Sequence, residues 1–388
     1  MLAERMNTFS GSPTSALIAK VAELRAEGKD IISLNVGEPD FGTPDYIKCG
    51  AIKAIVDNFS KYTAGNGIIE LRRLISKKLH EDNNLEYTTD EICATVGAKQ
   101  AIFNSIMALV DPGDEVLLPV PCWVSYTEMI KFAGAKPVFV DVEAETFDLD
   151  IEALEKAVTT KTKAIVICTP NNPTGAVYSE GTLRKLADLA CKYDFYIITD
   201  EIYEKLIYDD AKHFSIASIS KDVWNRTLTV NGFSKAYAMT GWRLGYVLAN
   251  EVIINAMNKI HQYVIMSAPT AAQYGAIEAM RYCDDEIEKM RKAYMLRRNY
   301  IVKAFNDMGL HTFTPQGAFY VFPCIKSTKM TSQQFCEELL KDQLVACVPG
   351  TAFGQAGEGF IRVSYAYSIE QIKEATTRIK KFLDKLDI

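Results

Sequence analysis

No stretch of this 388-residue sequence has the about 18 consecutive apolar residues that a membrane-spanning helix needs. The sequence has no C-x-x-C pair, and its nine cysteines are an odd number, so it fits a reducing compartment better than a disulfide framework. The first residues also lack the apolar centre of a secretory signal. These absences predict a cytoplasmic protein without a membrane segment.

The sequence has no excess of positive charge, since 49 acidic residues outnumber 43 lysines and arginines. The net charge of -6 argues against a nucleic-acid-binding face, because such a face needs clustered lysine and arginine. The four histidines are far apart and show no metal-ligand spacing, so we predict no metal site; they are His80, His213, His261 and His311. No G-x-G-x-x-G motif follows an early strand, which argues against a nicotinamide-binding oxidoreductase.

The sequence does contain a regular alternation of short apolar strands and helices from residue 91 onward. Strands are predicted at 91–96, 115–120, 137–141, 163–168, 195–199, 227–231 and 245–249, and helices at 98–110, 123–133, 150–158 and 180–193. This alternation predicts an α/β fold with a mostly parallel seven-stranded sheet covered by helices on both faces. Only about a dozen residues join the last two strands, so we expect an antiparallel pair at the sheet's edge.

The length of the chain predicts a second, smaller α+β domain. Charged helices over about 270–308 lead into it, and strands at 318–323 and 360–364 and helices at 332–341 and 369–386 build it. An N-terminal helix over about 15–27 and a strand at 31–34 complete it. We place an arm that joins the small domain at 1–40, the large domain at 41–285 and the small C-terminal domain at 286–388.

One stretch, residues 226–246 (RTLTVNGFSKAYAMTGWRLGY), organises the rest of the chain. It begins as an apolar strand, turns at Asn231-Gly232, presents Ser234 and Lys235, and reaches Arg243 before a second apolar run. A lysine directly after a strand end lies on a loop and not on a solvated helix face. Serine and arginine are residue types that hold a phosphate, so Lys235 is interpreted as a Schiff-base amine beside a phosphate anchor.

The pattern S-K-x5-G-x-R-x-G-Y in this stretch is the lysine signature of the class I/II aminotransferases. The tetrapeptide N-P-T-G at 172–175, D-E-x-Y at 200–203 and R-x-S at 362–364 follow the order of that family. The chain resembles the family from about residue 33 to 368, most closely the bacterial aspartate aminotransferases in which a lysine reads the side-chain carboxylate. The resemblance implies the fold-type I architecture, pyridoxal 5'-phosphate as cofactor and a homodimer.

The candidate cofactor residues follow the carboxyl ends of the predicted strands, where open α/β sheets bind their ligands. Gly97, Ala98 and Lys99 open a helix whose free N–H groups suit a phosphate, with a packing turn as the alternative. Asp200 follows a buried strand, and a buried carboxylate needs a partner such as a pyridinium nitrogen; capping a helix is its alternative role.

The resemblance assigns the remaining cofactor contacts. It implies that Trp123 stacks on the pyridine ring, although a core role is the alternative, and that Asn172 and Tyr203 hydrogen-bond the 3-oxygen. Ser234 and Arg243 would bind the phosphate, because an antiparallel return of the last strand brings Arg243 beside Ser234. Tyr62, before a glycine-rich turn, would reach the phosphate of the neighbouring subunit.

The resemblance also implies a substrate site. Arg362 would clamp the α-carboxylate with its planar fork, helped by the backbone of Gly37 and by Asn172. Trp123 lies beside it, and Lys99 would read a side-chain carboxylate, with Thr14 or Ser15 assisting. Cys122 replaces the tyrosine that is more usual before the tryptophan, which leaves the pocket's shape open.

The reaction implied is a ping-pong transfer of an amino group from an L-amino acid, aspartate, to a 2-oxoacid, 2-oxoglutarate. The catalytic residues would be Lys235, which carries the cofactor and moves the proton, Asp200 and Tyr203. Two alternatives remain open. One is an aminotransferase that uses aromatic amino acids or takes prephenate as acceptor, and the other is a carbon–sulfur lyase on the same fold. Amino acids and 2-oxoacids are the expected partners, with no nucleic acid and no membrane.

Overall fold

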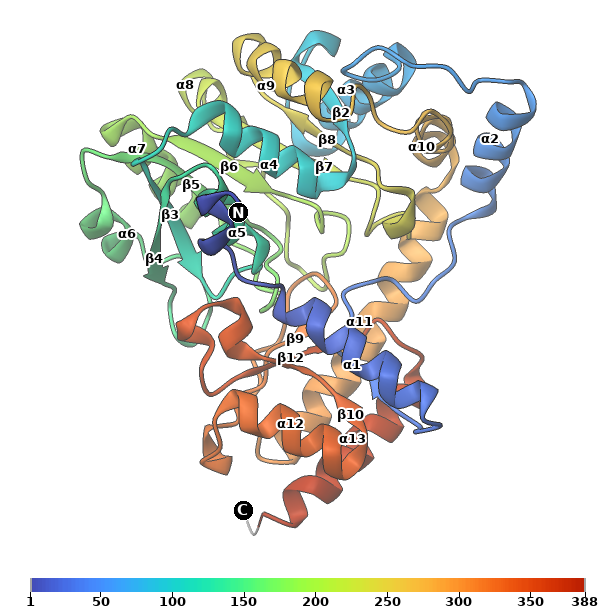
Figure 1. Cartoon of the computed structure of the whole chain (residues 1–388), viewed down its shortest axis with the longest axis vertical. Helices are drawn as coiled ribbons and strands as arrows, with labels where there is room; N and C mark the ends of the chain where they lie inside the picture. The colour runs from blue at the N-terminus through green and yellow to red at the C-terminus, as the bar shows by residue number, and fades with distance from the viewer. Residues whose placement is uncertain (1, 387–388) are drawn as a thin grey trace.

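The computed structural model describes residues 2–386. Figure 1 shows a large sheet with its helices in the upper part, the C-terminal elements in the lower part, and α11 running from one part to the other. The helices are α1 (Pro13–Ala26), α2 (Asp45–Val56), α3 (Ile69–Asn83), α4 (Gly97–Leu109), α5 (Ser125–Phe132), α6 (Ile151–Ala157), α7 (Glu180–Tyr193), α8 (Lys221–Asn225), α9 (Glu251–Val264), α10 (Thr270–Tyr282), α11 (Asp284–Asp307), α12 (Ser332–Gln343) and α13 (Ile369–Asp384). The strands are β1 (Ile32–Ser33), β2 (Ile92–Thr95), β3 (Glu115–Val120), β4 (Lys136–Asp141), β5 (Thr162–Cys168), β6 (Tyr196–Asp200), β7 (Thr227–Gly232), β8 (Gly245–Leu248), β9 (Tyr320–Val321), β10 (Val345–Ala346), β11 (Val348–Pro349) and β12 (Ile361–Ser364).

The predicted seven-stranded, mostly parallel sheet is confirmed, with the order β2-β8-β7-β6-β5-β3-β4. Its strands β7, β6, β5, β3 and β4 run parallel, whereas β8 is antiparallel to both of its neighbours. Every residue of β2, β3, β7 and β8 is buried. Such burial requires helices on both faces, which explains why these strands are apolar runs and not alternating ones.

The predicted antiparallel pairing of β7 and β8 is correct, but its place at the sheet's edge is wrong. The early strand β2 pairs with the outer side of β8, so β2 forms the edge and β8 lies second. Sequence patterns do not reveal this insertion, because β2 and β8 are more than a hundred residues apart. One consequence is that β2 ends at the same edge of the sheet as β7.

The two faces of the sheet bury alternate residues of each strand. Val116 and Leu118 pack in the core that contains α4, α5 and α9, whereas Leu117 packs with α6 and α7. Helices α3 and α10 cover the end of the sheet formed by β2 and β8. Side chains cap several of these helices, as when Ser179 accepts a hydrogen bond from the Thr182 N–H at the start of α7.

Two small sheets belong to the lower part of the molecule. An antiparallel sheet has the order β11-β12-β9, and β1 pairs in parallel with β10. Ile32 pairs with Val345, so the N-terminal segment lies against this part of the molecule. The strand β12 places Arg362 opposite Val348, which brings that arginine to the boundary with the large sheet.

Several elements were not predicted, among them α3, α8, α9, β10 and β11. The two strands have only two residues each, which is too short for a period to appear in the sequence. Among the helices of residues 2–386, none has both the length and the apolar character that crossing a membrane requires.

Candidate active site

A cavity of about 560 Å³ lies at the carboxyl ends of the large sheet. Eleven of the thirteen predicted site residues line it; the two that do not are Tyr62 and Gly97. Trp123 follows β3, Asn172 follows β5, Asp200 ends β6 and Lys235 follows β7. The chain leaves β3 for β4 on one side and returns to β5 on the other, so the cavity lies at a topological switch point.

Lys235 points its amine at the Gly37 carbonyl oxygen, with 2.6 Å between Nζ and O. Its Nζ also lies 5.9 Å from the Tyr203 ring centre and 5.8 Å from the Phe319 ring centre. Burial lowers the pKa of Lys235 to about 8; the negative charge of Glu38 opposes this shift, and Arg362 adds to it. Near neutral pH a larger fraction of this amine is therefore neutral than of an ordinary lysine.

Asp200 is the last residue of β6, and the residues that follow it form a turn, so the alternative of a helix cap does not apply. The Tyr126 hydroxyl donates to Oδ2 at 2.7 Å, and the Ile202 N–H donates to Oδ1 at 3.3 Å. Burial raises the pKa of Asp200 to about 6, against the lowering effect of those hydrogen bonds. A positive ring nitrogen in the cavity would relieve the cost of this buried charge.

Arg362 joins three parts of the chain. Its Nη1 donates to Asn172 Oδ1 at 3.0 Å, and its Nη2 donates to the Asn35 carbonyl at 2.7 Å. The guanidinium lies 4.6 Å from the Tyr320 ring centre, and burial lowers its pKa. Among the residues that the structure describes, the Nε of Arg362 has no hydrogen-bond partner. A planar cation with an unused donor suits a carboxylate ligand.

Beside α4, glycines let neighbouring side chains and backbone come unusually close to one another. Gly97 has φ +74, and a Cβ there would come within 2.7 Å of the Arg243 Nη2. A Cβ on Gly245 would come within 2.6 Å of the Ala98 nitrogen. Because Gly232 pairs with Gly245, Arg243 lies across the strand pair from Ser234, as the sequence predicts. The N-terminus of α4, a hydroxyl and an arginine thus surround one end of the cavity.

Lys99 and Trp123 face each other in the same cavity. The Lys99 Nζ lies 4.9 Å from the Trp123 ring centre. Burial and the neighbouring charge of Arg243 lower the pKa of Lys99. Thr14, from α1, also lines the cavity, so the N-terminal segment does reach the site. Cys122 is buried and does not line the cavity.

Three predicted residues have surroundings that the sequence did not indicate. Gly37 offers its carbonyl to Lys235, and Tyr203 shares a hydrogen bond with Tyr320, 2.9 Å between the hydroxyl oxygens. Tyr62 is 81% exposed and lies outside the cavity, so its predicted reach to a neighbouring subunit stays a prediction.

Tyr126, Tyr320, Asn35 and Glu38 line the cavity but were missed as site residues. Tyr126 lies three residues after Trp123, so it was the one that spacing along a helix start could have indicated. Tyr320 comes from a two-residue strand in the other half of the molecule, and only the folded chain brings it to the cavity.

The residues present fit pyridoxal phosphate. The N-terminus of α4 with a serine and an arginine, an aromatic ring, a buried carboxylate with a raised pKa and a lysine with a lowered pKa surround one cavity. Each matches one part of that cofactor: its phosphate, its ring, its ring nitrogen and its aldehyde. The fold and the site together define a fold-type I pyridoxal-phosphate enzyme.

Comparison with known proteins gives the family. The family model described as "Aminotransferase class I and II" matches residues 29–379. The chain therefore belongs to the class I and II aminotransferases, and it is a pyridoxal-phosphate-dependent aminotransferase. It is 47% identical to a putative aminotransferase, YugH, of Bacillus subtilis, over 95% of each chain. It is 46% identical to an aspartate aminotransferase of Pyrococcus abyssi, over 94% of this chain and 95% of that one.

Solved structures agree with this assignment. An aspartate aminotransferase from Thermus thermophilus with maleate has a TM-score of 0.95 and 41% identity, over 98% of this chain and 99% of that one. An aromatic aminotransferase from Pyrococcus horikoshii has a TM-score of 0.92 and 43% identity, over 98% of both chains. Structures named for aspartate and for aromatic amino acids are thus similar to this chain to a comparable degree.

Proposed function

We propose that this enzyme transfers the amino group of L-aspartate to 2-oxoglutarate in a ping-pong reaction. The observation that carries the proposal is a further basic side chain in the cavity, Lys99, in addition to Arg362, the catalytic Lys235 and the phosphate-side Arg243. A substrate with two carboxylates matches the two cations Arg362 and Lys99, whereas an aromatic amino acid leaves Lys99 without an ionic partner. Relatives named aspartate aminotransferase support the same substrate.

The cofactor would be held at four places. The N-terminus of α4 with Ser234 and Arg243 would bind its phosphate, Trp123 would cover its ring, and Asp200 would pair with its ring nitrogen. Asn172 and Tyr203 would contact its 3-oxygen. When bound, pyridoxal phosphate supplies an electron sink that makes the substrate's α-hydrogen acidic.

Lys235 would act as the acid–base group of the reaction. Its Nζ takes the proton from the substrate's α-carbon, which requires the neutral amine. A pKa of about 8 leaves that form available near neutral pH, in contrast to an ordinary lysine. Arg362 holds the α-carboxylate on one side, and the buried tyrosine pair Tyr203 and Tyr320 keeps that side of the cavity rigid.

Replacement of Lys99 by alanine tests the substrate proposal. The wild-type, loaded with cofactor, should be converted in a single turnover by aspartate faster than by phenylalanine. Lys99→Ala should lower kcat/KM for aspartate about 30-fold or more, the loss expected for one charged hydrogen bond, and leave that for phenylalanine within about threefold. Stopped-flow absorbance measures both rates.

Three other outcomes would contradict the proposal. Conversion by phenylalanine alone would favour an aromatic amino acid or prephenate aminotransferase. Release of ammonia and pyruvate from cystathionine would favour a carbon–sulfur lyase. An equal loss for both substrates in Lys99→Ala would mean that this lysine serves the cofactor phosphate instead of the side-chain carboxylate.

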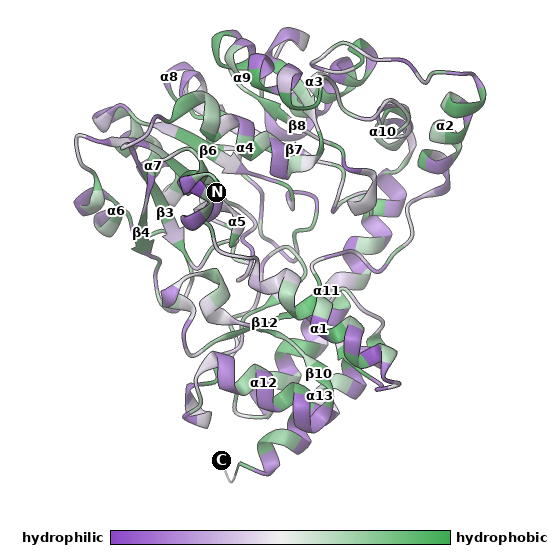
Figure 2. Cartoon of the chain, in the orientation of Figure 1, coloured by the Kyte–Doolittle hydropathy of each residue, from purple (hydrophilic) through white to green (hydrophobic). Residues whose placement is uncertain are grey.

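We further propose a homodimer in which Tyr62 serves the partner's site. Large apolar side chains are exposed on two helices of the large domain: Val56 of α2 is 70% exposed and Tyr263 of α9 is 94% exposed. Figure 2 shows hydrophobic segments along α2 at the periphery of the large sheet. Gln273 of α10 fixes the intervening loop by donating to Thr63 Oγ1 at 3.1 Å and accepting from the Ile68 N–H at 2.8 Å.

Mixed subunits test this arrangement. Tyr62→Ala and Lys235→Ala proteins should each have little activity, but a mixture refolded together should regain about a quarter of wild-type activity. The reason is that half of the dimers are mixed and each contains one site with both residues. Activity that stays at the level of the separate variants would contradict a shared site. A Tyr46→Ala protein, which alters a different exposed tyrosine, in α2, is the control.

The domain boundaries and location complete the proposal. We place the large domain at 41–285 and the small one at 286–388 with the 1–40 arm; β1 pairing with β10 and the start of α11 at Asp284 support these limits. Within residues 2–386 each of the nine cysteines has a free thiol, which supports a reducing, cytoplasmic location.

A further inference from the structure

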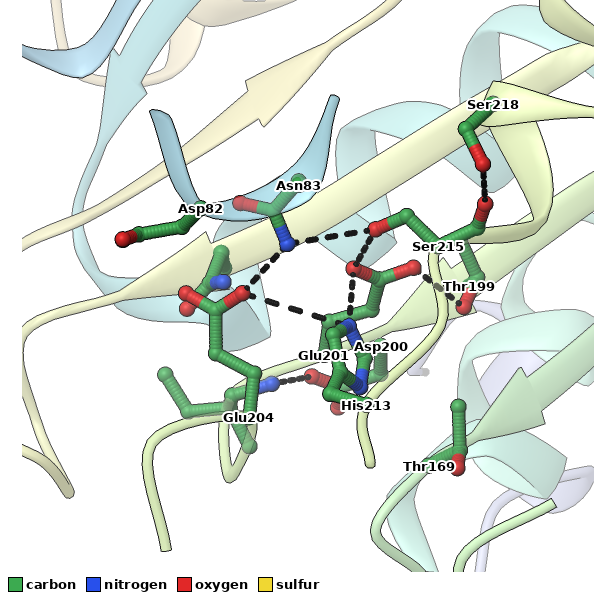
Figure 3. A network of polar contacts seen from close by, with 12 residues as sticks. Asp82, Asn83, Thr169, Thr199, Asp200, Glu201, Glu204, His213, Ser215 and Ser218 are labelled. Carbon is green, nitrogen blue, oxygen red and sulfur yellow. Dashed lines mark hydrogen bonds and ion pairs between the residues drawn. The ribbon is translucent and has the colours of Figure 1, made fainter. Parts of the chain in front are cut away.

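A buried polar network surrounds the turn that follows β6 (Figure 3). Its centre is Glu201, which is 1% exposed. The Glu201 Oε2 accepts from His213 Nε2 at 2.8 Å and from the Ser215 hydroxyl at 2.5 Å, and Oε1 accepts from Thr199 at 3.3 Å. None of these residues except Thr199 belongs to a regular strand or helix.

A second carboxylate, Glu204, extends the network to α3. Its Oε2 accepts from Asn83 Nδ2 at 2.8 Å, and Lys78 forms an ion pair with its other oxygen. His213 Nε2 lies 3.9 Å from Glu204 as well. Burial alone would lower the pKa of His213, but the two carboxylates outweigh it and raise the pKa above its ordinary value. With His213 protonated, two buried cations balance two buried anions.

The turn that contains Glu201 and Glu204 also carries residues that face the cavity. Asp200 and Tyr203 line the cavity, whereas Glu201 and Glu204 bond to the network. The Glu201 N–H continues the sheet by donating to the Val230 carbonyl at 2.8 Å. Because these residues follow one another directly along the backbone, any rotation of the turn moves Asp200 and Tyr203 along with Glu201.

Oxygen and nitrogen atoms of Glu201, Glu204 and His213 lie within 4.8 Å of one another, which is a spacing compatible with a metal ion. The contacts argue against that use. Glu204 Oε1 already forms an ion pair with the Lys78 ammonium. Glu201 Oε2 already accepts hydrogen bonds from Ser215 and His213. A divalent cation would have to displace three hydrogen-bond donors and would lie beside a lysine.

We propose that Glu201, held by His213 and Ser215, is a positioning residue that fixes the turn carrying Asp200 and Tyr203 against the cofactor. This role rests on the proposed assignment of those two residues to the ring nitrogen and the 3-oxygen. The network does not touch the cavity. It acts by keeping the Asp200 carboxylate aimed at one point, and a buried ionic cluster resists displacement because leaving it would strand unpaired charges.

Glu201→Gln tests the proposal, with Glu115→Gln as the matched control. Glu115 is also a buried carboxylate of the large sheet, but it bonds Thr159 and Lys136 at the opposite end of β3. Glu201→Gln should lower kcat about 10- to 100-fold with KM changed less than about threefold, the loss typical of groups that orient a ligand from behind. It should also shift, by about half a pH unit or more, the midpoint of the absorbance titration of bound pyridoxal phosphate.

Two milder variants guard against loss of folding. Ser215→Ala removes one hydrogen bond to Glu201 and should shift the titration midpoint in the same direction by less. His213→Gln keeps a donor for Glu201 and should recover part of the activity lost in His213→Ala. Glu115→Gln should lower Tm and leave kcat and the midpoint as in the wild-type.

A Glu201→Gln protein that loses Tm but keeps the wild-type kcat and titration midpoint would overturn the proposal. The titration needs no amino acid substrate, so an error in the proposed substrate would not affect it. A wild-type protein that gives no titrating band with pyridoxal phosphate would overturn the assignments of Lys235 and Asp200 and this role with them.

Discussion

Lys235→Ala should abolish transamination, with a loss of kcat of at least about 10⁴-fold. Among the cavity residues that the structure describes, Lys235 is the one amine whose pKa burial lowers to about 8, and its Nζ points into the cavity at the Gly37 carbonyl. Without it, no group in that position takes the α-proton. Single-turnover mixing of the loaded variant with aspartate measures the loss directly.

A matched control separates chemistry from folding. Lys163→Ala removes a lysine of β5 that lies over the Tyr196 ring, away from the cavity, and should leave kcat within about twofold of the wild-type. Lys235→Ala should keep the wild-type Tm or exceed it, because a buried amine with a lowered pKa destabilises the folded state below pH 8. Residual activity above about one part in a hundred would contradict the assigned role.

Asp200→Asn should lower kcat about 10³-fold and yet stabilise the protein without cofactor. Asparagine keeps the size of the side chain and an oxygen for the Tyr126 hydroxyl, but it cannot pair ionically with a protonated ring nitrogen. The activity loss should be largest in kcat, with KM for aspartate nearly unchanged. Steady-state kinetics with saturating pyridoxal phosphate measures the two constants separately.

The stability gain should depend on pH. Folding raises the pKa of Asp200 from 3.8 to about 6, so the folded state binds the proton more tightly than the unfolded chain does. The free energy of unfolding therefore falls by about 3 kcal/mol as the pH rises from about 4 to above 6. An asparagine side chain does not titrate, so the Tm advantage of the cofactor-free Asp200→Asn protein should be small at pH 4 and large at pH 8. An equal difference at both pH values would contradict a buried, unpaired carboxylate.

The large sheet could be predicted because its strands are continuous apolar runs separated by helices of ordinary length. The strands predicted at 115–120 and 163–168 differ from β3 and β5 by at most one residue. The place of β8 inside the sheet could not be predicted, since the period of a strand does not say which distant strand it pairs with. The two-residue strands of the small sheets have no period at all.

Motifs indicated the residues around the cavity, but not how these residues contact one another. Asn172 and Arg362 are 190 residues apart, and their hydrogen bond depends on how the small sheet packs on the large one. Tyr126 bonds Asp200, and Tyr320 bonds Tyr203, so each partner supports a residue that the motif did name. Such supporting residues carry no motif of their own, because many polar side chains can perform the same task.

Arg362 reaches its neighbours in a way that affects how tightly a substrate can bind. Two of its nitrogens are already bonded, to Asn172 and to the Asn35 carbonyl. A carboxylate that takes the whole fork must replace these bonds, so the free energy of binding is the difference between the new pair and the old ones. The exchange therefore lowers the net free energy that binding gains and favours release. It also means that a ligand loosens the link between the strand of Arg362 and the large sheet at the moment it arrives.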